Sequence, residues 1–124
     1  DTVRTTSLLE QSQNADLLVA EAMNMEIVQM MPRINEEIGN TFNAKILFDI
    51  QDYHMDVSDV GALAQEANVQ RLALTHLAPR SAKSVPKPQI SRQRDTFFRD
   101  PVEVIYTGEL FVGEDGMQIV IPVP

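Results

Sequence analysis

Apolar and polar residues alternate along the segment 71–77, and this period of two predicts a short buried strand. Leu72 and Leu74 are the apolar members of the alternation, and Pro79 ends the regular structure. His76 is therefore expected at the carboxyl end of the strand, where open α/β sheets gather ligands and metal ions. A histidine at such a place is also typical of a purely structural role, so the pattern alone leaves both interpretations open.

A second buried strand is predicted at 16–22, where a continuous run of apolar residues ends in an acid. Parallel strands that are buried on both faces have this appearance. Glu21 is expected at the carboxyl end of this strand, just as His76 is expected at the carboxyl end of the strand at 71–77. Before it, Ser7 and Glu10 fit a capping box that begins a short helix running to about Asn14.

Between the two strands the apolar spacing becomes helical. A helix is predicted within 23–42, with Gly39-Asn40 as its end, and a second short helix is predicted at 44–50. Pro32 is expected to kink or split the first of these helices. Its methionine-rich face is typical of a core or of a contact between subunits, because methionine is a flexible apolar filler.

A further helix is predicted to begin at a cap on Asp56 or Ser58 and to end at about Ala67. Asn68 suits the left-handed turn that ends such a helix. His54 is expected in the loop just before the cap. The succession of this helix and the following strand indicates a layered α/β fold.

The segment 78–96 is rich in proline and polar residues and is predicted to be a mobile loop. Five of the ten basic residues of the chain lie in it. This composition fits a solvated loop, and it also fits a lid over an anionic substrate.

The last part of the chain carries the signals of one short helix and a hairpin. Asp100-Pro101 is a typical helix start, and Gly108 is expected to stop that helix. The segments 109–113 and 117–122 are predicted to form a β-hairpin with Asp115-Gly116 at its turn.

The composition narrows the functional classes. The chain of 124 residues carries a net charge of −8, which disfavours nucleic acid as a partner because the two would repel each other. It contains no cysteine, which excludes disulfides, cysteine-based zinc sites and a thiol nucleophile. No apolar run is long enough to span a membrane and no signal peptide is visible, so a soluble protein of the cytoplasm or periplasm is expected. The chain opens at Asp1 without an initiator methionine, so we expect a processed protein or a part of a longer one.

Four residues are candidates for chemistry, namely Asp1, Glu21, His54 and His76. Histidines and carboxylates are ligands of zinc and of other divalent metal ions. These four are far apart in the sequence, so the spacing alone favours a metal site no more than a carboxylate–histidine proton relay. The chain has neither a glycine-rich phosphate loop nor a serine nucleophile elbow.

Short motifs follow one another in a characteristic order. They are Asp1-Thr2, similar to the end of Ser-Gly-Asp-Thr; the segment 17–22, similar to a strand ending in His-Glu-Ala; His54 with the following helix; the segment 74–80, similar to Leu-Thr-His-Leu-Ser-Pro-Arg; and the segment 112–119, similar to Val-Ala-Glu-Asp-Gly-Met-Glu-Ile. In this succession the chain resembles the C-terminal half of a metallo-β-lactamase-fold hydrolase, in the branch of tRNase Z, arylsulfatases and phosphodiesterases. It departs from that branch at Ala20, where a histidine is usual, and it lacks the His-x-His-x-Asp-His motif.

The resemblance implies an α/β fold in which residues 1–124 form the C-terminal half of a single four-layer αββα metallo-hydrolase domain. It implies a site with two divalent metal ions, zinc in the first place, with manganese or iron as alternatives. Asp1 would bridge the two ions and His76 would bind one of them. His54 would be a catalytic residue that does not bind metal, and Glu21 would orient a histidine.

The activity implied is hydrolysis of an ester by a metal-bound hydroxide, with a small phosphodiester, an aryl sulfate or a lactone as the substrate. One alternative is a tRNA 3′-processing endonuclease, and another is a non-catalytic α/β interaction domain. The expected partners are the small-molecule ester, the N-terminal remainder of the same protein and a second copy bound through the methionine-rich segment. Neither nucleic acid nor a membrane is expected as a partner.

Overall fold

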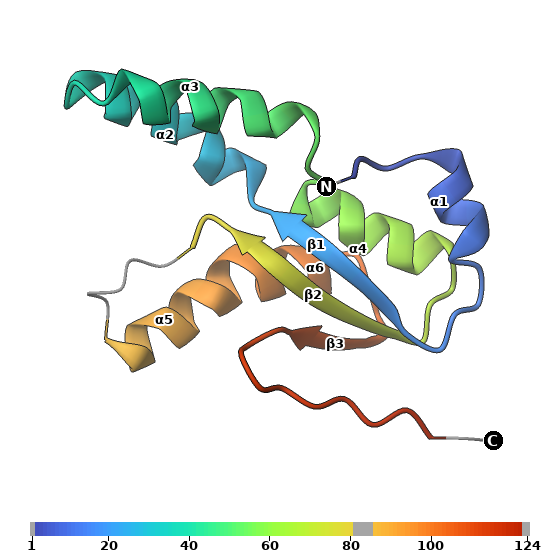
Figure 1. Ribbon diagram of the computed structural model, residues 1–124. Helices are drawn as coiled ribbons and strands as arrows, with labels where there is room; N and C mark the ends of the chain where they lie inside the picture. The colour runs from blue at the N-terminus through green and yellow to red at the C-terminus, as the bar shows by residue number, and fades with distance from the viewer. Residues whose placement is uncertain (1, 81–85, 123–124) are drawn as a thin grey trace.

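The computed structural model describes residues 2–80 and 86–122 (Figure 1). Its helices are α1 (Thr6–Gln11), α2 (Met25–Glu37), α3 (Thr41–Asp49), α4 (Val57–Glu66), α5 (Lys87–Arg94) and α6 (Asp100–Glu103), with a 3₁₀ turn η1 (Ile50–Asp52) and a π-helical stretch η2 (Asp95–Arg99). Its strands are β1 (Leu18–Met23), β2 (Arg71–Ala78) and β3 (Glu109–Val112).

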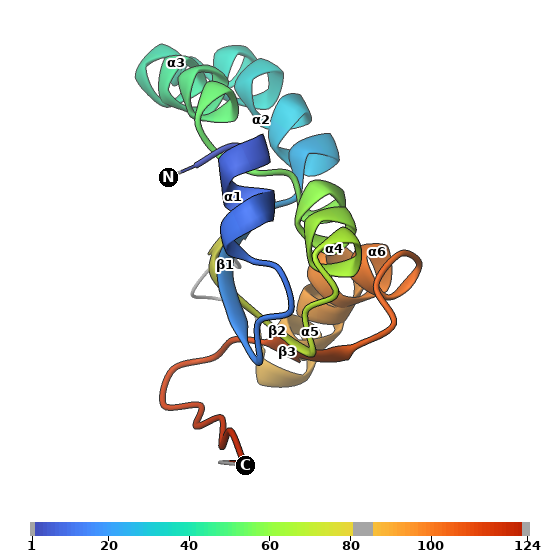
Figure 2. The same ribbon diagram turned by 90° about the vertical axis from the view of Figure 1, so that its right-hand side faces the viewer.

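The three strands form a parallel sheet in the order β1-β2-β3. Both predicted strands form, and they pair in parallel. Burial of β1 on both faces was wrong, because Val19 is 59% exposed. Helices α4 and α6 lie on one side of this sheet (Figure 2). The core between them contains Leu63 of α4, Val102 of α6, and Leu72 and Leu74 of β2, all fully buried. The carboxyl ends of β1 and β2 lie on the side of α2 and α3 (Figure 1).

Helix α4 follows its sequence signals closely. Asp56 is its N-cap, and its Oδ2 accepts a hydrogen bond from the Ser58 N–H at 3.0 Å. Asn68 adopts a left-handed conformation with φ of 54°, as the helix end requires. In α1 the cap is Thr5, whose hydroxyl accepts from the Leu8 N–H at 3.1 Å, so the start predicted two residues later was wrong.

Helices α2 and α3 form an antiparallel pair that extends beyond the sheet, and we call this pair the arm (Figures 1 and 2). Asn24 caps α2 with its side-chain oxygen, and Gly39 ends it with φ of 77°. Helix α2 runs through Pro32 without a break, so a split at the proline was wrong. The packing of α2 on α3 compensates for the lost backbone hydrogen bond, since tertiary contacts override local propensity.

The segment 78–96 is not irregular throughout, because α5 occupies Lys87–Arg94. Prolines are tolerated at its start, where the first backbone N–H groups have no partner within the helix. At its end, Arg94 forms an ion pair with Glu114 at 3.0 Å, a contact that no local pattern reveals. The predicted mobility of 78–96 stays a prediction, and residues 81–85 lie outside the described residues.

The expectations for the end of the chain were correct only in part. An α-helix, α6, does begin at Asp100 with Pro101 in its first turn, but it follows η2 directly, Asp100 is not its N-cap, and it ends at Glu103. The wider π turn of η2 already interrupts the regular bonding there, which lets the proline fit. The turn at 114–117 forms, with Met117 N–H donating to the Glu114 carbonyl at 3.0 Å, but residues 117–122 form no strand. β3 pairs with β2 instead, because alternation in sequence does not specify which strand becomes the neighbour.

Within the described ranges, no helix is both long enough and apolar enough to span a bilayer.

Candidate metal centre

Glu21 and His76 are brought together by the register of the sheet. Glu21 lies opposite Thr75 in the parallel pair of β1 and β2, so the carboxylate lies beside the next residue, His76. The register shifts between Glu21 and Met23, and such an irregularity re-aims side chains at the end of a strand. His76 itself has φ of 44°, a left-handed conformation that is uncommon outside glycine and concentrates at functional sites.

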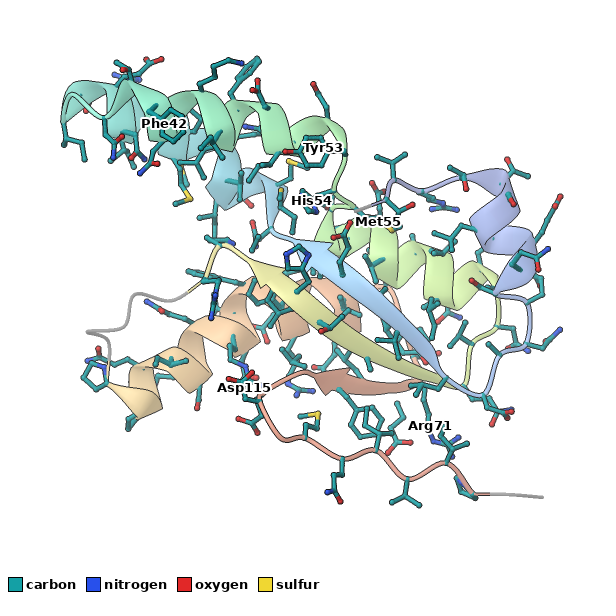
Figure 3. All side chains as sticks on the ribbon, viewed as in Figure 1. Phe42, Tyr53, His54, Met55, Arg71 and Asp115 are labelled. Carbon is teal, nitrogen blue, oxygen red and sulfur yellow. The ribbon has the colours of Figure 1, made fainter. Side chains whose placement is uncertain are left out.

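His54 reaches the same place from the loop that joins the arm to α4. Met23 N–H donates to the Met55 carbonyl at 3.0 Å, which fastens this loop to the end of β1. Asp56 adds a second attachment, because its Oδ1 accepts from the Met25 N–H at 3.0 Å while its other oxygen caps α4. His54 therefore lies between the base of the arm and the end of β1 (Figure 3).

The centre is built around one carboxylate oxygen. Oε2 of Glu21 lies 2.8 Å from Nδ1 of His54 and 3.1 Å from Nδ1 of His76. Its other oxygen, Oε1, accepts from the backbone N–H of Thr2 at 2.8 Å. The two imidazole rings meet edge to face with their centroids 5.5 Å apart. One acid thus fixes the orientation of both histidines.

The protonation of Glu21 determines that of the histidines. Burial by itself would raise the pKa of this carboxyl, but the hydrogen bonds from Thr2, His54 and His76 and the charge of His54 lower the pKa to about 2. At neutral pH Glu21 is therefore ionised and can only accept hydrogen bonds. Each Nδ1 must then carry the donated proton, which leaves Nε2 as the nitrogen suited to a metal ion.

The side chains differ in exposure in a way that matches different roles. Glu21 and His54 are 7% and 11% exposed, whereas His76 is 67% exposed. Glu21, His54 and His76 each offer one ligand atom, and these atoms lie within 4.8 Å of one another. Two imidazoles and a carboxylate are a donor set that zinc and related ions take. Because the Glu21 carboxylate already accepts from both Nδ1 groups, the Nε2 atom of the exposed His76 is the donor of this set that best fits a metal ion.

The structure brings together three of the four candidate residues of the sequence, namely Glu21, His54 and His76. Asp1 lies outside the described residues. Sequence patterns missed the contribution of the Thr2 backbone and the double role of Asp56. The capping signal at Asp56 was visible, but its bond to the start of α2 depends on tertiary structure.

A cavity of about 590 Å³ adjoins the centre on the side of α5. Its walls come from the end of β2, from the helical run α5–η2 and from the segment after β3, and they include His76, Arg80, Arg94, Phe98, Glu114 and Asp115. The cavity thus combines an aromatic wall with charges of both signs.

No family model matches the chain. Among solved structures, a metallo-β-lactamase fold protein, YhfI from Bacillus subtilis, superposes with a TM-score of 0.57 over 94% of this chain, with 21% sequence identity. The chain forms part of a metallo-β-lactamase fold. This finding confirms the expected fold class.

One curated relative adds sequence similarity to this metallo-β-lactamase fold. It is ribonuclease Z of Haloferax volcanii, 33% identical over 72 residues, which are 58% of this chain. The chain spans only 20% of the length of that relative and 35% of the length of YhfI.

Proposed function

We propose that this chain supplies the C-terminal part of the active site of a metal-dependent hydrolase that cleaves an ester-type substrate. The observation that carries the proposal is the single Glu21 oxygen that holds Nδ1 of both His54 and His76. Carboxylate–histidine pairs of this kind orient imidazoles for metal binding and proton transfer.

His76 is the proposed metal ligand of the described residues. It is the more exposed histidine, it lies at a strand end, and Glu21 occupies its Nδ1 so that Nε2 is directed to a different partner. Asp1 is proposed as a second ligand that bridges two ions, on the sequence resemblance alone. Two divalent ions, zinc in the first place and manganese or iron as alternatives, supply when bound a water of lowered pKa and positive charge for the developing anion.

His54 is the proposed proton donor to the leaving oxygen. Glu21 holds its ring in one orientation at 2.8 Å, and the loop bonds of Met55 and Asp56 fix its backbone neighbours. The proton given to the leaving oxygen would come from Nε2 of the doubly protonated ring, because the Nδ1 proton is donated to Glu21. Glu21 is proposed as a positioning residue that acts through both histidines.

A small phosphodiester, an aryl sulfate or a lactone is the proposed substrate. The cavity beside His76, of about 590 Å³, has a size typical of small-molecule sites. The net charge of −8 disfavours a large polyanion over most of the surface.

A tRNA 3′-processing endonuclease is the second candidate, and the similarity to a ribonuclease Z favours it. Two features count against it, namely the acidic charge and Ala20, which stands where the motif of that branch has a histidine. The candidates differ in a simple observable. Binding of tRNA should weaken steeply with rising salt, whereas hydrolysis of a neutral lactone should change little.

The test uses the full-length protein with His76→Ala, His54→Ala and, as a control, Gln70→Ala at the opposite end of β2. Metal content is measured by mass spectrometry, and hydrolysis is followed with a nitrophenyl phosphodiester, a nitrophenyl sulfate and a lactone. We expect about two ions per wild-type chain. His76→Ala should lose metal, and His54→Ala should keep it while turnover falls by about 100-fold or more.

Some outcomes contradict the proposal. Full turnover of His54→Ala would exclude its role as proton donor. If both histidine variants keep every property of the wild type, as the Gln70→Ala control should, the chain is a non-catalytic interaction domain.

A further inference from the structure

The arm exposes a regular series of large apolar side chains. Met30, Ile34, Ile38, Phe42 and Ile46 recur at every fourth position across the turn between α2 and α3, and they are 56%, 54%, 72%, 75% and 42% exposed. Residues four apart lie on the same side of a helix, so each helix carries a row rather than scattered residues. Phe42 lies on the outer part of the arm, far from Tyr53 at its base (Figure 3).

These rows are not the buried part of the arm. The buried residues within α2 and α3 are Val28 and Ala44, at 1% and 3% exposure. The apolar area left exposed by the five residues is about 600 Å² if a large side chain contributes about 200 Å². Exposed apolar area on this scale is at the upper end of what a typical monomer shows and is often functional.

We propose that the arm is a dimerisation surface and that its occupant is the arm of a second copy of this chain. Two copies would bury about 1,200 Å² together, which reaches the lower bound of stable protein interfaces. A surface that meets itself across a two-fold axis needs only to be self-complementary. Two antiparallel helix pairs can meet this condition by forming a four-helix bundle.

The charge on the arm is small. Residues 25–49 carry four acids (Glu26, Glu36, Glu37 and Asp49) and two bases (Arg33 and Lys45), a net charge of −2 against −8 for the whole chain. Arg33 pairs with Glu37 at 3.1 Å and Lys45 pairs with Asp49 at 2.6 Å. The repulsion between two arms is therefore limited to a small excess of acidic residues, Glu26 and Glu36.

The position of the arm also leaves it accessible. It extends beyond the sheet on the side opposite the tail that follows β3, and both views agree on this (Figures 1 and 2). Both β1 and β3 carry an outer edge that no described strand pairs with, so further strands of the fold can add at either edge.

The test measures the oligomeric state of the full-length protein by light scattering coupled to size exclusion. We expect the mass of a dimer for the wild type at micromolar concentration. The double variant Ile34→Lys/Ile38→Lys and the single variant Phe42→Asp should raise the dissociation constant by at least about 100-fold, because a buried ion of either sign replaces apolar contact. The changes suit their helices, since Lys near the end of α2 and Asp near the start of α3 complement the helix dipoles.

Val104 provides the matched control, because it is 85% exposed and lies outside the arm. Val104→Lys and Val104→Asp should leave the dimer intact, and circular dichroism should show native helix content for every variant. A wild-type protein that is monomeric at micromolar concentration overturns the proposal and assigns the arm to another part of the same chain. A dimer that persists in both arm variants overturns it as well.

Discussion

The sheet end, by which we mean Glu21, His54 and His76 at the carboxyl ends of β1 and β2, is a neighbour of the arm in the fold. Charged side chains are usually exposed and large apolar side chains are usually buried, and each of the two regions reverses one half of this rule. The sheet end buries a charge, the Glu21 carboxylate at 7% exposure, whereas the arm leaves the Phe42 ring 75% exposed. A buried charge costs free energy unless it is paired, and an exposed apolar row gains free energy only when a partner covers it. This contrast agrees with the two proposals, a small ligand at the sheet end and a second protein surface at the arm.

The two regions are joined by two capping residues. Asp56 accepts from the backbone of both Met25 and Ser58, so it caps α4 and supports the start of α2. Asn24 caps α2 and donates its amide to the Phe97 carbonyl at 2.9 Å. The base of the arm is thus fixed to the sheet end, while its rows remain exposed. This division allows either region to be altered separately.

The largest expected effect follows from Glu21→Gln, which removes the charge that holds both histidines at the sheet end and leaves the arm unchanged. Glutamine keeps the shape but loses the charge, and its NH₂ group cannot accept a hydrogen bond from a histidine. Because one acid orients two histidines, we expect the proposed turnover of the full-length protein to fall by about 100-fold. Glu10→Gln, at an exposed position in α1, is the control and should retain full turnover.

Acid should weaken the same region of the protein after a chelator has removed bound metal. The pKa of Glu21 lies at about 2, below its ordinary value of 4.5, so the ionised form stabilises the folded state. This contribution is present above about pH 5 and is lost as the pH falls to about 2, at a cost of about 3 kcal/mol. Urea unfolding at several pH values measures the loss, and Glu21→Gln should remove this part of the pH dependence.

Asp56→Ala should affect both regions, because the residue connects them. The loss of two backbone hydrogen bonds is expected to lower the free energy of unfolding by about 1–2 kcal/mol. Asp59→Ala, in the exposed first turn of the same helix, should cost less than about 0.5 kcal/mol. Equal losses in the two variants would show that Asp56 does not connect the arm to the sheet end.

The smallest expected effect comes from Phe42→Ser in the arm. The side chain is 75% exposed and contributes little to folding of one chain, so the free energy of unfolding of the monomer should change by no more than about 0.5 kcal/mol. Thermal unfolding at a concentration below the dimer dissociation constant measures this quantity. A much larger loss would mean that the ring packs within its own chain.

The features that could be predicted from sequence are those with local signals. The strands that carry Glu21 and His76 show buried apolar runs, and α4 shows a cap at Asp56 and a left-handed end at Asn68. Helix α5 escaped prediction because its prolines read as a loop, and the contacts that hold it are distant in sequence. The hairpin after β3 was expected because alternation indicates a strand but not its partner.

In the candidate site, too, some placements could be predicted from local sequence and others depend on tertiary structure. The placement of Glu21 and His76 at adjacent strand ends follows from the rule that the carboxyl ends of parallel strands share one edge. The convergence of His54 on the same carboxylate oxygen could not be predicted, because it depends on the tertiary bonds of Met55 and Asp56. The family resemblance indicated the participants, and only the structure shows that one acid holds both rings.

The most direct test of this centre is the tautomer of His54 and His76 in the metal-free protein. Nitrogen-15 NMR at alkaline pH, assigned with His54→Gln and His76→Gln, reports which ring nitrogen carries the proton. We expect the proton on Nδ1 in both rings, because the ionised Glu21 accepts from each Nδ1. Protons on Nε2 in both rings would contradict the central claim that Glu21 orients the two histidines for metal binding and proton transfer.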